Sequence, residues 1–164
     1  MNVRKLTPTD DWAAIGNIYQ RSWQAAYRGI VPQNYLDSLD GSLWTAAFGD
    51  HPYTSFVLLD NEKYIGTSAV CAARDETMAG FGEIVSIYLL PEYFGRGCGT
   101  PLFQHAAGHL LDEGYSRICL WVLAQNLHAQ KFYEKQGFQP NGDRASMTIA
   151  GKELEELRYI KCFE

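Results

Sequence analysis

The chain has 164 residues, of which 46% are hydrophobic and 20% are charged, and its formal net charge is −5. This length and composition predict one globular domain spanning residues 1–164, large enough to bury a core without disulfides. The acidic balance argues against a large nucleic-acid-binding surface. No apolar run approaches the length of a membrane span and no signal segment is recognisable, so we expect a cytoplasmic protein with neither nucleic-acid nor membrane partners.

The four cysteines are far apart in the sequence and form no Cys-x-x-Cys pair. This spacing argues against a zinc site, and we expect no bound metal. Cys71 and Cys119 lie in apolar runs and are predicted to be buried free thiols, as is usual in a reducing compartment.

Hydrophobic periodicity and turn residues predict the elements of the first half of the chain. Asp10 or Asp11 can cap the first helix, because short polar side chains accept hydrogen bonds from free helical N–H groups. In chain order we expect a strand at 3–6, a helix from the cap to about residue 27, a short helical segment between 32 and 40, a turn at 43–48, and strands at 55–60, 63–72 and 82–90.

The second half alternates helices and strands. Pro101 suits the first turn of a helix, Asn126 suits an N-cap, and Gly114 and Gly137 follow the helices that they end. In chain order we expect a helix at 102–111, a strand at 117–123, a helix at 127–136, and a hairpin of strands 145–149 and 154–160. The whole pattern predicts an α/β fold, with a mixed sheet flanked by helices.

Residues 91–100 (PEYFGRGCGT) are the most informative stretch, because three alternate glycines stand between a strand and a helix. Glycines let the backbone turn sharply and approach a ligand, and a helix N-terminus presents free N–H groups to an anion. The spacing fits neither the dinucleotide motif Gly-x-Gly-x-x-Gly nor the nucleoside-triphosphate loop, which needs Gly-Lys-Ser or Gly-Lys-Thr. The stretch therefore predicts a cradle for another phosphorylated cofactor.

A second motif follows at residues 126–138 (NLHAQKFYEKQGF). Together with residues 88–99 (YLLPEYFGRGCG), and less specifically with residues 23–29, it resembles the GNAT superfamily of acyl-CoA-dependent N-acetyltransferases. The resemblance covers residues 63–160. It implies a central mixed, mostly antiparallel sheet that is splayed at the acyl-CoA site, with acetyl-CoA as cosubstrate.

The same resemblance implies the residues that hold acetyl-CoA. The pantetheine arm is expected along the main chain of Ile87, Tyr88 and Leu89, with a contact from Asn126, although capping alone would explain Asn126. The main-chain N–H of Tyr88 or Leu89 is expected to hold the oxyanion. The pyrophosphate is expected on the N–H groups of Phe94, Gly95, Arg96, Gly97, Cys98, Gly99 and Thr100.

Phe94 departs from the family, which usually has Gln or Arg at this position. We expect binding to survive, because main-chain donors do not depend on the side chain. The Arg96 side chain has two alternatives, contact with a CoA phosphate or exposure to solvent.

The resemblance also implies direct attack of a primary amine on acetyl-CoA in a ternary complex. Holding a lysine-like amine neutral at pH 7 costs about 4.6 kcal/mol, so a base, direct or through water, is needed. Glu83 is the candidate base and Tyr133 the candidate acid that protonates the CoA thiolate and contacts the thiol. The alternatives are a solvated strand-end carboxylate for Glu83 and core packing for Tyr133.

The acceptor pocket is expected between the N-terminal helices and the mouth of the sheet, at Trp23, Tyr27, Tyr35, Tyr88 and Glu83. These aromatic rings can hold a cationic amine, or can simply pack the helices. We expect a small-molecule amine as acceptor. The alternatives are a protein or peptide N-terminus or lysine, or a non-catalytic acetyl-CoA-binding module. A homodimer is a further expectation from the family.

Overall fold

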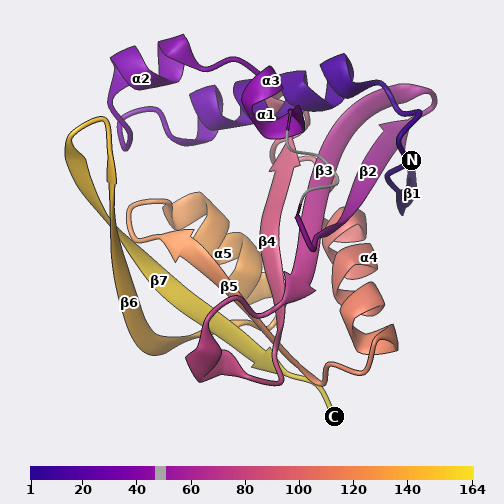
Figure 1. Ribbon diagram of the computed structural model, residues 1–164, viewed down its shortest axis with the longest axis vertical. Helices are drawn as coiled ribbons and strands as arrows, with labels where there is room; N and C mark the ends of the chain where they lie inside the picture. Colours follow the sequence, from indigo (N-terminus) through magenta and orange to yellow (C-terminus); the bar gives the residue numbers. More distant parts are fainter. Residues whose placement is uncertain (47–50) are drawn as a thin grey trace.

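The computed structural model describes residues 1–46 and 51–164 (Figure 1). The predicted turn at 43–48 is a short helix over its first part, and residues 47 and 48 lie outside the described residues. The elements in chain order are β1 (Asn2–Lys5), α1 (Trp12–Ala26), α2 (Gln33–Ser38), α3 (Ser42–Thr45), β2 (Thr54–Asp60), β3 (Lys63–Ala72), the 3-10 turn η1 (Glu76–Met78), β4 (Gly82–Leu89), the 3-10 turn η2 (Pro91–Tyr93), α4 (Gly99–Asp112), β5 (Arg117–Leu123), α5 (Leu127–Lys135), β6 (Gln139–Ile149) and β7 (Lys152–Cys162).

The seven strands form one sheet in the order β1-β2-β3-β4-β5-β7-β6. Every neighbouring pair is antiparallel except β4 and β5, which are parallel. That parallel pair joins only at Gly82 with Ile118 and Glu83 with Cys119, after which the two strands diverge (Figure 1). The predicted mixed, mostly antiparallel sheet with a splay is therefore confirmed.

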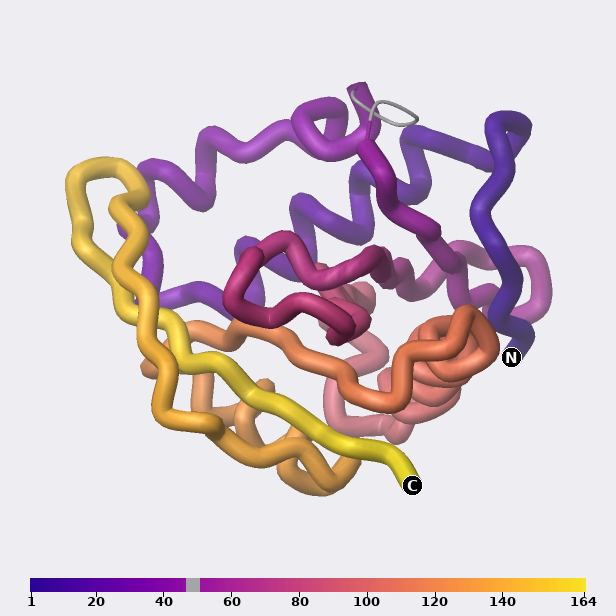
Figure 2. The backbone as a smooth tube through the Cα atoms, turned by 60° about the horizontal axis from the view of Figure 1, so that its bottom comes forward, coloured from indigo at the N-terminus to yellow at the C-terminus, as the bar shows by residue number. Residues whose placement is uncertain are grey.

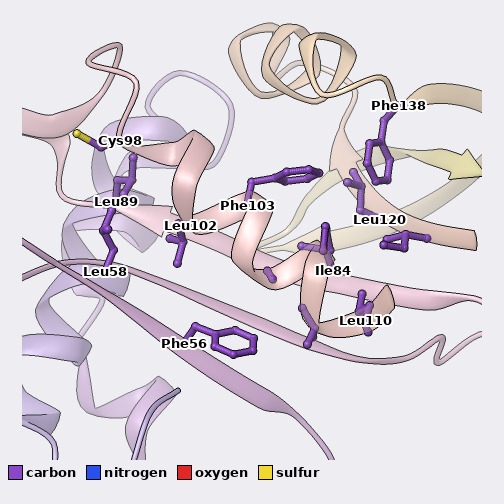
Figure 3. Packing of buried hydrophobic residues seen from close by; sticks show 14 of the residues in the cluster. Phe56, Leu58, Ile84, Leu89, Cys98, Leu102, Phe103, Leu110, Leu120 and Phe138 are labelled. Atoms are coloured by element: carbon purple, nitrogen blue, oxygen red, sulfur yellow. The ribbon is translucent and has the colours of Figure 1, made fainter. Parts of the chain in front are cut away.

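Helix α4 covers one face of the sheet through an apolar stripe. Figure 3 shows Leu102, Phe103 and Leu110 of this helix with Ile84 of β4 and Leu120 of β5. All five side chains are 3% exposed or less, so this contact is the centre of the core. The burial fixes the start of α4, and with it the glycine turn, against β4.

The opposite face is covered by α1 and α2, and the hairpin of β6 and β7 folds towards them (Figure 2). Ile149 and Leu154, beside the hairpin turn, pack with Leu36 and Leu39 of the α2 region. The Lys152 ammonium donates to the carbonyl of Ile30 at 2.5 Å. The hairpin was predicted too short, since β6 begins at residue 139 rather than 145.

A bulge in β4 decides which side chains face the splay. Ala69 pairs with Ser86 and Val70 with Ile84, so Val85 has no partner on β3. Strict alternation would place Glu83 and Tyr88 on opposite faces, but the extra residue reverses the second half of the strand. Ile84 and Leu89 both point into the core under α4, and consequently Glu83 and Tyr88 both face the α1 side.

Candidate active site

The glycine turn bends the chain from β4 into α4. Gly95 and Gly97 have φ angles of 69° and 78°, which side-chain-bearing residues rarely adopt. A Cβ on Gly99 would lie 3.3 Å from the Phe132 ring, so glycine also allows α5 to approach. In the part of the chain that the structure describes, the N–H groups of residues 95–99 make no hydrogen bond. The turn thus presents five consecutive donors at a helix N-terminus, which suits an anion.

The set of free N–H donors in the structure is narrower than the set that the sequence indicated. The N–H of Phe94 donates to Pro91 at 3.1 Å, and that of Thr100 donates to Gly97 at 3.2 Å. Both groups are therefore used within the turn. The Phe94 ring lies 6.5 Å from that of His128, the Arg96 side chain is exposed, and Cys98 is buried.

The splay leaves one edge of β4 open beside the turn. Beyond Glu83, β5 pairs with β7 and no longer with β4. The N–H of Leu90 donates to Ile65 of β3, so by alternation the main chain of Leu89 and Ile87 points to the open edge and that of Tyr88 to β3. The open edge therefore offers main-chain groups of two of the three predicted pantetheine residues.

Tyr133 reaches this opening from α5. Its ring packs against Phe132 at 5.4 Å and Phe103 at 6.3 Å between centroids. Burial raises the pKa of its phenol well above the usual range, and the nearby Tyr88 hydroxyl raises it further. Tyr133 therefore carries its proton at neutral pH and can act as a donor. Asn126 caps α5 by accepting from the N–H of Ala129 at 3.2 Å, which leaves its amide NH₂ for another partner.

Three further rings lie near Tyr133: Trp23 of α1, Tyr27 at the C-cap of α1, and Tyr88 of β4. We call Trp23, Tyr27, Tyr88 and Tyr133 the aromatic cluster. Trp23 contacts Tyr27 edge to face at 4.7 Å. Burial raises the pKa of Tyr27, and the adjacent Tyr88 hydroxyl and then Tyr133 raise it further. The Trp23 indole Nε1 is buried and makes no hydrogen bond of good geometry. Tyr35 packs, like Trp23 and Tyr27, against the apolar contacts of α2 with the hairpin.

Glu83 has surroundings that differ from the expected aromatic ones. It is 3% exposed, and Arg74, in the loop after β3, binds its carboxylate. The guanidinium donates to Oε1 at 2.5 Å through its terminal nitrogen, Nε lies 3.2 Å from both oxygens, and the main-chain N–H of Arg74 donates to Oε2 at 3.0 Å. Glu83 is thus a buried carboxylate paired with a half-exposed arginine, rather than a solvated strand end. Its predicted role as base stays a prediction.

Sequence reasoning missed three charged residues that face the splay: Arg74, Glu156 and Arg158. Arg158 is 3% exposed, stacks 4.4 Å from the centre of the Trp121 ring, and pairs with Asp75 and Asp143. Glu156 lies on β7 opposite Leu123 of β5. Strand alternation could have identified two of them, because Glu156 and Arg158 share a face of the strand with the apolar Leu154.

A cavity of about 320 Å³ adjoins the cluster on the α1 side of Tyr88. Its walls are mostly aromatic and apolar, and include Trp12, Tyr19, Trp44 and Val85. Within residues 1–46 and 51–164, no three His, Cys, Asp or Glu side chains gather as metal ligands. Among the helices in these two ranges, none is long and apolar enough to cross a membrane.

Comparison with known proteins bears on this arrangement. Residues 12–138 match the family described as the acetyltransferase (GNAT) family. An uncharacterized N-acetyltransferase, YuaI of Bacillus subtilis, is 29% identical over 90% of this chain and 86% of its own length. The spermidine N(1)-acetyltransferase of Thermoplasma acidophilum is 24% identical over 94% and 98%. The N-alpha-acetyltransferase 30 of Schizosaccharomyces pombe is 34% identical over 53% and 58%.

The solved structures agree on the fold. The PaiA N-acetyltransferase of Thermoplasma acidophilum, solved in complex with coenzyme A, superposes with a TM-score of 0.77 and 20% identity, over 99% of this chain and 98% of that one. The family match covers more than half of the chain, and the free donors of the glycine turn fit the phosphates of CoA. The chain therefore belongs to the acetyltransferase (GNAT) family and is an acyl-CoA-dependent N-acetyltransferase, for which acetyl-CoA is the supported cosubstrate.

Proposed function

We propose that the protein transfers the acetyl group of acetyl-CoA to a small primary amine by direct attack within a ternary complex. The observation that carries this proposal is the meeting of three features at one place. The free N–H groups of residues 95–99, the open edge of β4 and the protonated Tyr133 hydroxyl lie around the splay. The spermidine acetyltransferase relative supports a small cationic amine as the acceptor.

The cosubstrate is proposed to bind mainly through the main chain. The N–H groups of residues 95–99 hold the pyrophosphate, and Arg96, exposed beside them, pairs with a phosphate. The main chain of Ile87 and Leu89 pairs with the pantetheine arm along the open edge, and the free amide NH₂ of Asn126 donates to it. This arrangement brings the thioester to the aromatic cluster.

Two groups are proposed to stabilise the reaction itself. The main-chain N–H of Leu89 points to the open edge, so it is better placed than that of Tyr88 to donate to the oxyanion. The Tyr133 hydroxyl gives its proton to the departing CoA thiolate, because a phenol held protonated by burial stays a donor at neutral pH.

The proton of the acceptor amine needs a second group. Glu83 is the residue that the sequence indicated, but Arg74 donates to both of its oxygens. Glu83 is also only 3% exposed, so it would reach the amine only through a bridging water. The Glu83→Gln variant tests whether Glu83 takes the amine proton through such a water.

Two measurements test this function. The first is the thermal melting of the protein with CoA and with acetyl-CoA, where a ligand at 100 times its Kd adds about 2.7 kcal/mol and raises Tm by several degrees. The second is thiol release from acetyl-CoA with spermidine, with 2-phenylethylamine and with a short alanine-initiated peptide. Turnover of either small amine supports the proposal. Turnover of the peptide alone indicates a protein acceptor, and a melting shift without any turnover indicates a binding module.

A further inference from the structure

Glu83 and Glu156 both face the splay, and their carboxylates differ in their partners. Glu83 is held by Arg74, whereas the half-buried Glu156 carboxylate makes no hydrogen bond or ion pair with any described residue. We propose that Glu156 binds the ammonium group of the acceptor and takes its proton before attack. This inference rests on the proposed function and replaces Glu83 with Glu156 as the proton acceptor.

The position of Glu156 follows from strand alternation. Leu154, Glu156 and Arg158 share one face of β7. Leu154 packs with the α2 region and Arg158 stacks on Trp121, so the side chain between them points to the side of the sheet that carries the aromatic cluster. Glu156 is close enough to raise the pKa of both Tyr27 and Tyr88. It therefore stands beside the rings that are proposed to receive the amine.

The lack of a partner distinguishes Glu156 from its neighbours. Glu155, on the other face of β7, pairs with Arg144 at 2.5 Å. A half-buried carboxylate without a directly bonded partner is costly to keep, since burial removes water and no protein group replaces it in contact. An acceptor ammonium would supply the missing charge, and the rings of Tyr27 and Tyr88 would add cation–π contacts. The site is thus complete only when a cation occupies it.

The groups around Glu156 also set its proton affinity. Burial raises its pKa, Arg74 lowers it, and Glu83 raises it again. Arg158 lies on the same face but is already paired with two aspartates, and the two tyrosines stay neutral. A carboxylate of raised pKa is a better base than an ordinary one and releases the proton to water afterwards.

The protons of the reaction balance with these groups. The acceptor enters as R–NH₃⁺ and gives one proton to Glu156. The neutral amine nitrogen then bonds to the thioester carbon, the C–S bond breaks, and Tyr133 protonates the leaving thiolate. The second amine proton returns to the Tyr133 phenolate, directly or through water, and Glu156 releases its proton to solvent. The products are the amide, CoA thiol and one proton.

The experiment compares Glu156→Gln with Glu155→Gln, its outward-facing neighbour, and with Glu83→Gln. Each variant is melted with and without acetyl-CoA, and kcat/KM for spermidine is measured from pH 6 to pH 10. We expect Glu156→Gln to keep the acetyl-CoA melting shift and to lose about 100-fold in kcat/KM at pH 7, the lower range for loss of an acid–base group. The loss should shrink towards pH 10, where spermidine loses its own protons, and Glu155→Gln should match wild type.

Several results would overturn the inference. The inference fails if Glu156→Gln has the kcat/KM and the pH profile of the wild type. It also fails if the large loss of kcat/KM at pH 7 occurs in Glu83→Gln and not in Glu156→Gln. A higher KM for spermidine with an unchanged pH profile would overturn the proton-transfer step. If Glu156→Gln does not fold, Glu156→Asp serves: the inference requires a reduced rate with the acidic limb of the profile retained. Absence of turnover in the wild type, despite a melting shift, would instead overturn the proposed function.

Discussion

The glycine turn and the aromatic cluster both border the splay, but they are built differently. The turn presents main-chain N–H groups of five consecutive residues, 95–99. The cluster uses side chains from α1, β4 and α5, with charged neighbours from β7 and the loop after β3. A main-chain site tolerates side-chain changes and fails when the backbone is strained, whereas a side-chain site fails at single functional groups. Variants in the two regions should therefore separate binding of acetyl-CoA from turnover.

The largest effect is expected in the cluster. Tyr133→Phe removes the proposed proton donor but keeps the ring that packs on Phe132 and Phe103. We expect kcat to fall about 100-fold, the lower range for an acid–base group, with the acetyl-CoA melting shift unchanged. Steady-state kinetics with saturating acetyl-CoA measure this. Unchanged kcat would mean that another group or water protonates the thiolate.

In the glycine turn we expect a change in acetyl-CoA binding without a change in kcat. Gly97→Val places a β-branched residue at φ 78°, although no atom lies within 4 Å of its Cβ. The resulting strain of about 1–3 kcal/mol should open the turn and weaken acetyl-CoA binding about tenfold, with kcat at saturation retained. Calorimetric titration with acetyl-CoA measures the Kd. Gly108→Ala, inside α4 with equal space, is the matched control and should leave the Kd unchanged.

An effect on stability, rather than on binding or turnover, is expected from the ion pair of Arg74 and Glu83 at the point where β4 and β5 separate. Arg74→Met leaves the buried Glu83 carboxylate without its cation. Loss of one partner of a buried pair costs about 3–5 kcal/mol, and we expect about 2 kcal/mol because Arg74 is half exposed. Chemical denaturation measures the free energy of unfolding.

Controls for this pair are available in the same chain. Arg144→Met breaks the exposed pair with Glu155 and should cost about 0.5 kcal/mol or less. The double variant Arg74→Met/Glu83→Met should regain most of the lost stability, because no buried charge is left unpaired. Equal losses in the single Arg74 and Arg144 variants would contradict a structural role for the Arg74–Glu83 pair.

The difference between the two regions also explains what the sequence could predict. Elements β3, β5 and the start of α5 were predicted at their observed bounds, and Asn126 and Gly137 cap and end α5 as expected. These signals are local, since caps, turns and periodicity act within a few residues. The glycine turn is local in the same sense, and it was recognised.

The surroundings of the splay depend on contacts that are distant in sequence. Arg74, in the loop after β3, binds Glu83. Glu156 comes near Tyr88 only because β7 lies beside β5, and the bulge at Val85 reverses the face of Tyr88. None of these follows from residue type or spacing. The same limit explains why Glu83 was expected among aromatic rings, and why the start of β6 was missed.

The smallest effect is expected at Phe94, where the family usually has Gln or Arg. Phe94→Gln restores a hydrogen-bonding side chain beside the turn and removes the ring that faces His128. Because the donors of residues 95–99 belong to the main chain, we expect the Kd of acetyl-CoA to change less than threefold, about 0.65 kcal/mol. Calorimetric titration of Phe94→Gln and Gly97→Val with acetyl-CoA under the same conditions allows the two Kd values to be compared directly. A tenfold tightening would show that a side-chain contact is missing in this chain, and the main-chain account of the turn would then be insufficient.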